Sequence, residues 1–485
     1  PDCLTWQQIS AACKEGRQLM VISNEVYDVA AWVQKHPGGK VLLTYVGEDA
    51  TDSVRAFHRD EQQMAKYLSP LRVATLAKQV PGAPLHEVVA SRDAALEKDF
   101  RNLRTKLQEA GLFKANPWFY MAMLAHVIVL ELAGWAVLKY FGSAWLPYCL
   151  AVALLVVAQA QAGWLQHDLG HLSVFKSREL NLFCHRFVII HLKAASSAWW
   201  NYRHYLHHAK PNIAEADPDI NMPYVFMLGE KMAEHWAKKQ KLGTAGGPMP
   251  YNKQHIYWWA LGPPLLLPVY FHYENLRYVI GNAVFGGSGM WKDSYNTSKY
   301  MAKGRIFFWE EVVWMASFFV RWHYMYGPLL GGVGGWVAFY MTVRTVESHW
   351  FVWVTQMSHL SMSIGKYADV PCHDWASLQV NATCNVEGGV FNDWFTGHLN
   401  YQIEHHLFPT MPRHNYSTVA PLVKDLFARH GREKDYISKT LLSAFGLSRP
   451  PAPPLRYLVG AFSVRPYVMF CHISPPPPPF FPQGL

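Results

Sequence analysis

The chain has 485 residues, of which 15% are aromatic and only 16% are charged, and its formal net charge is +9. A soluble domain typically has about 25% charged residues, so this composition argues against a purely soluble protein and indicates a membrane protein with soluble parts. The positive charge is spread without a dense Lys/Arg tract, which argues against nucleic-acid binding and fits the basic flanks of membrane spans. The seven scattered cysteines include no CxxC pair, which argues against a disulfide framework and for a reducing compartment.

In chain order, the sequence divides into four expected parts. Residues 1–80 are mixed in polarity and predict a soluble domain. Residues 81–116 are polar and end in AALEKDFRNLRTKLQEAGL, which we expect to be a linker and an amphipathic helix leading to the membrane. Residues 117–445 carry the long apolar stretches and most of the histidines, and the proline-rich residues 446–485 predict an extended or disordered tail.

Five apolar stretches fall in the third part. Residues 118–141 and 144–165 each exceed the length of about 20 residues that a spanning helix needs, and only a short turn separates them. We therefore expect a tight membrane hairpin. Three further stretches follow at residues 257–275, 306–326 and 327–346.

Glu310, Glu311 and Arg321 interrupt the later stretches, and charges at membrane depth are costly unless they face protein or water. We therefore expect one of the three late stretches to lie along the membrane interface. If the histidines of residues 167–208 and 359–406 meet at one site, an even number of crossings separates them. Two such crossings and the first hairpin predict four spans.

Two histidines of the first part, His36 and His58, are spaced to face each other across a pocket. Two neutral imidazoles fill both axial positions of a heme, which suits electron transfer. The HPGG motif alone is explained as well by a surface turn, but Trp6, Trp32, VYDV and GEDAT agree with it. Residues 4–77 closely resemble the cytochrome b5 domain, and the resemblance implies heme b with His36 and His58 as its axial ligands.

Three polar clusters, called here the histidine boxes, recur at helical spacing. Positions i, i+3 and i+4 share one face of a helix, so we expect the members of each box to point at one spot. The first box is His167 and His171, the second is His204, His207 and His208, and the third is Gln402, His405 and His406.

The boxes predict a metal centre. One pair alone is explained as well by hydrogen-bonded histidines at the interface, but three clusters on one side of a membrane exceed what core packing needs. Imidazole suits Zn, Cu, Fe and Ni, and the ligands are too many for one tetrahedral zinc. Two metals fit better, and an attached one-electron donor favours iron.

The motifs HDLGH, HHAKPN, DPDINM, ESHWFVWVTQM, ATCNVE and HLNYQIEHHLFPTMPRHN resemble those of the membrane fatty acid desaturases. The resemblance runs from about residue 4 to about residue 445. The fused cytochrome b5 domain and the glutamine of the third box resemble the front-end desaturases, and the last motifs are most similar to animal acyl-CoA delta-5 and delta-6 enzymes.

This resemblance implies a mainly α fold: an N-terminal α+β cytochrome b5-like heme domain, then a four-span helical membrane domain with a cytosolic histidine-rich cap. It implies a multi-pass protein of the endoplasmic reticulum membrane, with the heme domain and the boxes in the cytosol. It also implies a catalytic diiron site. The implied ligands are His167, His171, His204, His207, His208, His405 and His406, with His359 as the additional family histidine and Gln402 as ligand or near-ligand.

The implied reaction uses O2 and two electrons to place a cis double bond between an existing one and the carboxyl end of a polyunsaturated acyl-CoA. No GxGxxG fingerprint is present, so we expect NADH to act through a separate partner, cytochrome b5 reductase. A sphingoid-base desaturase or related hydroxylase shares the boxes and the heme domain and stays open, as does a non-catalytic membrane heme protein. Double-bond position and chain length are not readable from the motifs.

Several neighbouring residues have two interpretations. Asp168, Asp217 and Asp219 are candidate acceptors that hold histidine rings, although solvated loop acids explain Asp217 and Asp219 equally well. Lys210 and Arg203 fit either acyl-CoA phosphates or the basic flank of a membrane protein.

Three further expectations concern single positions. We expect His398 either to support a metal ligand or to be structural. We expect the weaker amide of Gln402 to loosen the coordination of one metal or to reach it through water. Asn296 begins a glycosylation sequon that is usable only on the lumenal side.

Overall fold

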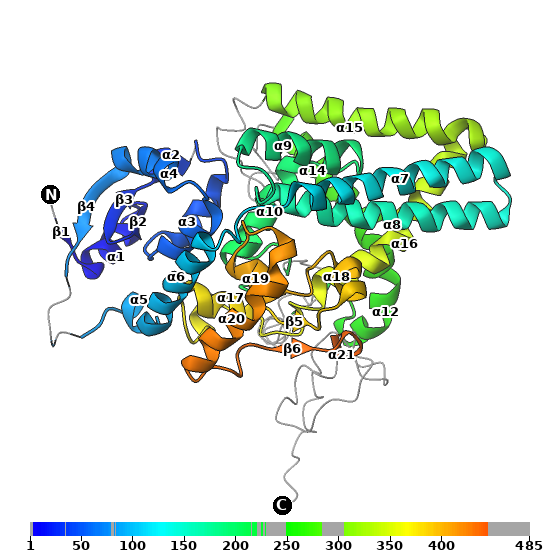
Figure 1. Ribbon diagram of the computed structural model, residues 1–485. Helices are drawn as coiled ribbons and strands as arrows, with labels where there is room; N and C mark the ends of the chain where they lie inside the picture. The colour runs from blue at the N-terminus through cyan, green and yellow to red at the C-terminus, as the bar shows by residue number, and fades with distance from the viewer. Residues whose placement is uncertain are drawn as a thin grey trace, which may run out of the picture.

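The computed structural model describes residues 3–444, apart from residues 34, 79–81, 83, 215, 221–224, 227, 229–248 and 284–304. Asn296 and the expected tail at residues 446–485 lie outside the described residues. The fold is mainly helical, with a small sheet at the N-terminus (Figure 1).

The N-terminal domain, residues 3–78, is built on a four-stranded sheet in the order β1-β4-β3-β2. The β1–β4 pair is parallel and the other two pairs are antiparallel. The strands are β1 (Cys3–Leu4), β2 (Leu19–Ile22), β3 (Glu25–Asp28) and β4 (Arg72–Leu76). The helices are α1 (Trp6–Lys14), α2 (Ala30–Val33), η1 (Gly39–Tyr45), α3 (Thr51–Phe57), α4 (Glu61–Leu68) and η2 (Ser69–Leu71).

Side chains along β2 alternate between the two faces of the sheet, so each face has a hydrophobic core. Leu19 and Val21 pack against Ile9 of α1, whereas Met20 and Ile22 pack on the other face, where α3 lies. The N-terminal domain therefore has its own hydrophobic core.

Four long helices form the body of the second part: α7 (Pro117–Phe141), α8 (Trp145–Gly170), α15 (Arg305–Tyr326) and α16 (Val333–Gln356). Figure 1 shows α7, α8 and α15 as long, roughly parallel rods. Leu155 of α8, Trp322 of α15 and Phe339 of α16 are fully buried in their shared core. Of the helices described, α7 and α8 are long and apolar enough to cross a membrane.

The outward faces of these helices carry large apolar side chains. Trp118 and Val129 of α7 are 75% and 62% exposed, and Val313 and Tyr324 of α15 are 66% and 75% exposed. Apolar surface on this scale is unfavourable in water and is expected against lipid.

The three charges that interrupt the late apolar stretches all have partners. Glu310 accepts a hydrogen bond from Arg186 at 2.8 Å, and Arg321 forms an ion pair with Glu131 of α7. Glu311 is buried and caps a neighbouring helix, as described below. Pairing of this kind is what makes charges tolerable in an apolar helix.

The apolar stretch at residues 257–275 is not one helix. It is divided into α12 (Gln254–Leu261), α13 (Pro263–Leu265), the π-helical turn η5 (Leu266–Phe271) and α14 (His272–Ala283). Two consecutive prolines begin α13, and proline removes a backbone donor and interrupts a helix. None of these pieces reaches the length of about 20 residues that a span needs.

The remaining elements form a cap over one end of the long helices. They are α9 (Arg178–Arg186), η3 (Phe187–His191), α10 (Ser197–Ala209), η4 (Tyr251–Lys253), η8 (Tyr367–Asp369), α17 (Trp375–Ala382), β5 (Asn385–Val386), α18 (Val390–Thr396), α19 (Gln402–Leu407), η9 (Arg413–Asn415), α20 (Tyr416–Arg429), β6 (Ser438–Lys439) and α21 (Leu441–Ala444). The short turn η7 (Gly327–Leu329) instead joins α15 to α16. Strands β5 and β6 pair in parallel.

The helices α5 (Glu87–Ala90) and α6 (Ala94–Glu109) connect the two parts. Leu96, Phe100, Leu103 and Leu107 are buried at helical spacing along α6, and they pack in one core with residues of α17, α19 and α20. The expected amphipathic helix is present, but its apolar face packs against the cap.

Candidate metal centre

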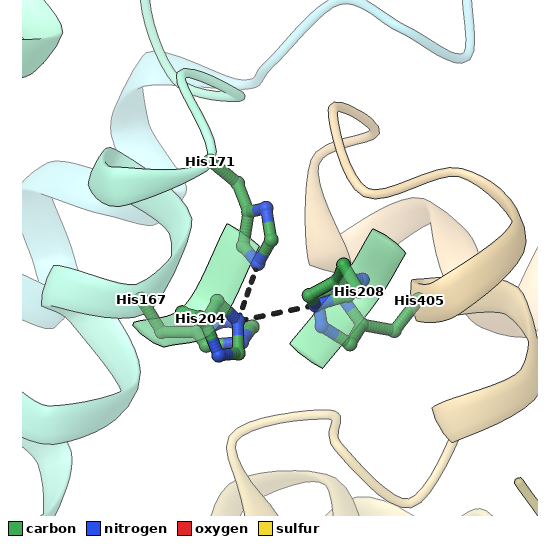
Figure 2. Close-up of side chains that lie close together, drawn as sticks. All are labelled: His167, His171, His204, His208 and His405. Carbon is green, nitrogen blue, oxygen red and sulfur yellow. Dashed lines mark hydrogen bonds between the residues drawn. The ribbon is translucent and has the colours of Figure 1, made fainter. Parts of the chain in front are cut away.

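Five histidines from all three boxes converge at the junction of the cap and the long helices. Figure 2 shows their rings pointing toward one another. Their ligand nitrogens all lie within 4.8 Å of one another. The members of this five-histidine cluster are His167 and His171 at the end of α8, His204 and His208 of α10, and His405 of α19.

His204 makes more close nitrogen contacts than hydrogen bonding explains. Its Nε2 atom lies 2.8 Å from Nε2 of His171 and 3.1 Å from Nε2 of both His167 and His208. A neutral imidazole nitrogen either donates or accepts one hydrogen bond, so these three contacts cannot all be hydrogen bonds. In addition, Nε2 of His405 is buried without a hydrogen-bond partner. The site therefore fits a metal ion that shares these nitrogens.

A second group, the three-histidine cluster, lies beside the first. His207, His359 and His406 bring their ligand nitrogens within 4.8 Å of one another. The Gln402 amide is 2.8 Å from Nε2 of His359, and a flip of that amide exchanges its nitrogen and oxygen. Nε2 of His406 is buried without a hydrogen-bond partner. Three imidazoles and an amide fit a second metal ion.

Each of the second and third boxes is divided between the two clusters, so the expectation that each box points at one spot is wrong. His204 and His208 of the second box lie in the five-histidine cluster, and His207 lies in the three-histidine cluster. In the third box, His405 belongs to the first cluster and His406 to the second. On a helix, position i+4 is rotated by about 40° from position i, whereas i+3 is rotated by about 60° the other way. The residue at i+3 therefore points to a different cluster from the residues at i and i+4.

Four cluster histidines of the cap favour the neutral form. Burial, together with the neighbouring histidines, lowers the pKa of His204, His208, His405 and His406 well below the ordinary value. A neutral ring keeps the lone pair that a metal needs.

Hydrogen bonds to the outer nitrogens hold several rings in place. Nδ1 of His406 lies 2.9 Å from Oε1 of Gln379, and Nδ1 of His405 lies 3.1 Å from the Tyr416 hydroxyl. Such contacts direct Nε2 toward the metal. Neither partner is predictable from the sequence, because one buried polar residue in an apolar helix carries no distinctive spacing.

Asp217 holds His207 of the three-histidine cluster. Its carboxylate is buried, lies 2.9 Å from Nδ1 of His207 and accepts backbone N–H groups of Asn212 and Asp219, each at 2.8 Å. Burial opposes the charged form of His207, but the Asp217 carboxylate raises its pKa above the ordinary value. Asp219 is partly exposed, lies 3.9 Å from the ring and pairs with Arg203. Of these two acids, Asp217 is therefore the one that orients the ring.

The other polar residues near the boxes lie outside both clusters. Asp168 forms an ion pair with Arg413 at 3.1 Å and lies 3.8 Å from Nδ1 of His167. His398 packs edge-on against Phe119.

Local features bring the first two boxes close together. A Cβ atom at Gly170 would overlap the Trp200 ring, so glycine is required where α10 crosses α8. The buried carboxylate of Glu311 accepts hydrogen bonds from the Ser196 hydroxyl at 2.5 Å and from the Ala198 N–H at 3.0 Å, at the beginning of α10. These contacts fix the helix that carries the second box.

An apolar pocket leads to both clusters. Trp199, Trp258, Phe271 and Phe351 line it, together with Leu266. It also reaches histidines of both clusters and Gln402. An apolar pocket with a few convergent polar groups is typical of a binding site for a mainly apolar ligand.

His36 and His58 face each other in the N-terminal domain. Their ring centroids are 5.9 Å apart, and Nδ1 of His58 contacts the Val54 carbonyl at 2.8 Å, which leaves Nε2 to face His36. Burial, His58 and the positive charge of Arg178 lower the pKa of His36 to about 3. Two neutral rings across a gap fit a metal with both axial positions filled.

Lys210, two residues after His208, connects the cap to the N-terminal domain. Its ammonium lies 2.6 Å from the Glu48 carboxylate and sits over the rings of Tyr45 and Tyr367, at 4.6 and 3.7 Å from their centroids. Both expectations for Lys210, that it binds acyl-CoA phosphates or belongs to the basic flank of a membrane span, are wrong. Lys210 holds two domains together.

Comparisons with known proteins match both parts of the chain. Residues 143–438 match the family model "Fatty acid desaturase", and residues 5–77 match "Cytochrome b5-like Heme/Steroid binding domain". The chain is 43% identical over 443 residues to the fatty acid desaturase 2-like protein FADS2B of Mus musculus, covering 91% of this chain and 83% of the relative. It is 43% identical over 429 residues to fatty acid desaturase 3 of Homo sapiens, covering 88% of this chain and 87% of the relative.

Proposed function

The chain belongs to the fatty acid desaturase family and carries a cytochrome b5-like heme domain, and we propose that it is a front-end desaturase. The proposed substrate is a polyunsaturated acyl-CoA, which receives a cis double bond between an existing one and the carboxyl end. One observation carries the proposal: two adjacent histidine clusters lie along an apolar pocket.

We further propose that the two clusters hold two non-heme irons. The five-histidine cluster provides the ligands of one, and His207, His359 and His406 with Gln402 provide those of the other. The irons would supply what acid–base groups lack, a way to reduce O2 and remove hydrogen atoms from unactivated methylene groups. The partnerless Nε2 atoms of His405 and His406 support this assignment.

The residues of the pocket bind and orient the acyl chain. The rings of Trp199, Phe271 and Phe351 provide apolar walls for the chain. The pocket continues to His204 and His207, one from each cluster, so a methylene group in it lies next to both proposed metals.

Electrons reach the clusters through the heme domain of the same chain. His36 and His58 are the proposed axial ligands of heme b, and their paired neutral rings suit one-electron transfer. The proposed donor to this heme is NADH-cytochrome b5 reductase.

The proposed topology has four spans, α7, α8, α15 and α16, in the membrane of the endoplasmic reticulum. The first and third boxes meet at one place, so an even number of crossings separates them. The broken stretch from α12 to α14 leaves α15 and α16 as the pair, and their exposed apolar faces suit lipid. The heme domain and the boxes then lie in the cytosol.

Expression in yeast tests the reaction. Cells that produce the chain are fed polyunsaturated fatty acids of different lengths, linoleic acid among them, and their fatty acids are separated by gas chromatography. We expect a product with a new double bond on the carboxyl side of the existing ones, absent with His406→Ala. If the chain is present with a normal heme spectrum and no acid is converted, front-end desaturation is contradicted, and sphingoid bases become the next substrates to test.

A further inference from the structure

The segment that carries the proposed heme ligand His58 contacts the neighbourhoods of all three boxes. On one side of His58, Arg59 donates hydrogen bonds to the carbonyls of Leu172, at 2.9 Å, and Phe175, at 3.1 Å. Leu172 directly follows His171 of the first box. The heme-binding loop is therefore attached to the end of the first box.

On the other side of His58, the loop is attached to the third box. The Thr410 hydroxyl donates a hydrogen bond to the Ala56 carbonyl at 3.2 Å, and Thr410 lies four residues after His406. This contact is buried, the two Arg59 contacts are partly buried, and all three join residues far apart in the sequence. They fix the position of Phe57, which lies between Ala56 and His58.

Phe57 makes the contact to the second box. Its ring centroid lies 6.4 Å from that of His208 and 5.9 Å from those of Tyr205 and Trp375, with edge-on geometry in each case. Phe57 is covalently bonded to His58. One side chain therefore connects a heme ligand to a metal-site ligand.

His208 is also the place where the two clusters meet. Its Nε2 atom lies 3.1 Å from Nε2 of His204 in the five-histidine cluster. On its other side, its ring stacks on His406 of the three-histidine cluster, with centroids 4.1 Å apart and an interplanar angle of 18°. The His208 ring therefore contacts both clusters, and an electron that arrives there can pass to either one.

We propose that Phe57 is the bridge through which electrons pass from the heme to the diiron site, with His208 as the receiving ligand. The inference rests on the proposed function, because it requires iron at the clusters. Each transfer would oxidise a ferrous heme to ferric and reduce one ferric ion held by the clusters to ferrous, with no proton or bond exchanged. The reductant is the reduced heme.

The docking of the domains supports this route. Electron transfer through protein weakens steeply as the gap between donor and acceptor widens, so a fixed short contact is favourable. The Tyr45 hydroxyl donates a hydrogen bond to the Ala209 carbonyl at 2.7 Å, and Lys210 pairs with Glu48. Both anchors directly follow His208, so they hold the heme domain at the point where Phe57 makes its contact.

Stopped-flow measurement of heme reoxidation tests the proposal with a signal that is independent of product formation. The purified full chain, loaded with heme and iron, is reduced and mixed with O2 and linoleoyl-CoA, and oxidation of the heme is followed by its visible absorbance. His406→Ala gives the background rate for a chain with a damaged metal centre. The variants are Phe57→Leu and Phe57→Met, which remove the ring, Phe57→Tyr, which keeps it, and Tyr67→Leu, which removes an exposed ring elsewhere on the heme domain.

We expect reoxidation to slow by about tenfold or more in the Leu and Met variants and to stay near the wild-type rate in Phe57→Tyr and Tyr67→Leu. The heme spectrum, the heme potential and the iron content are measured for each variant, so a slow rate is assigned to the bridge only where all three match the wild type.

The outcomes separate the two proposals. If the wild type reoxidises no faster than His406→Ala, electrons do not reach the clusters and the proposed function fails. If the wild type is faster and a variant without the ring keeps that rate, Phe57 is not the bridge. A slow Phe57→Tyr variant with normal heme and iron also overturns the proposal, because that variant keeps the ring.

Discussion

Lys210 Nζ lies 2.6 Å from Glu48 Oε2, and this ion pair joins the helix of the second histidine box to the heme domain. The lysine side chain is only 4% exposed, and its ammonium contacts the rings of Tyr45 and Tyr367. Its position directly after His208 and Ala209 couples the docking of the domains to the metal site.

The first prediction concerns this ion pair. Lys210→Met leaves the half-buried Glu48 carboxylate without its cation, and we expect a loss of about 2 kcal/mol in the free energy of unfolding. Thermal unfolding followed by heme absorbance measures it. Exposed Lys66→Met is the matched control, expected within about 0.5 kcal/mol of the wild type. In the double variant with Glu48→Gln, the two losses are expected to be less than additive, and full additivity would contradict the coupling.

The second prediction separates the two acids near His207. Asp217→Asn removes the charge that orients the ring, and we expect activity or metal affinity to fall by about 10- to 100-fold. Asp219→Asn is the control, because its carboxylate is partly exposed and 3.9 Å from the ring. Product formation and bound iron are measured for both. Equal effects of the two substitutions would show that the Asp217 contact has no special role.

The third prediction uses the separation of the proposed heme site from the histidine clusters. His406→Ala is expected to lose non-heme iron and activity while the heme spectrum stays normal. His58→Ala is expected to lose the heme while the non-heme iron remains. Absorbance and metal analysis of the same samples check both. Loss of heme in His406→Ala would mean that the variant has lost its fold and would require His406→Gln instead.

The fourth prediction concerns Gln402. Its amide lies beside His359 in the cluster that has only three histidines among the described residues. Gln402→His adds a strong ligand, and we expect activity to fall by about tenfold while the iron content is kept or increased. Gas chromatography and metal analysis measure the two effects. Full activity in Gln402→His would show that the amide has no special role.

Much of the candidate site was predictable because its ligands lie on short helices. The spacing of His167 and His171, and of His204 and His208, predicted shared faces, and the structure brings each pair into one cluster. The division of each later box between two clusters was not predictable, because it depends on how α8, α10 and α19 cross. The polar contacts of Gln379 and Tyr416 depend on the same crossing.

The fold was also predicted in outline. A mainly helical chain with a cytochrome b5-like domain and a histidine cluster is confirmed. The sequence could not show that α6 packs against the cap, because an amphipathic face fits a membrane surface or a protein core equally well. It also could not show the contact between Lys210 and Glu48, which are far apart in the chain. The number of spans stays a prediction.

The iron-to-heme ratio of the purified full chain tests the central claim most directly. Metal analysis gives total iron, and the absorbance of the heme gives its amount. Two proposed non-heme irons and one heme iron predict about three irons per heme, falling toward one in His406→Ala. A wild-type ratio of about one iron per heme would contradict the account and would leave a membrane heme protein whose histidine clusters bind no iron.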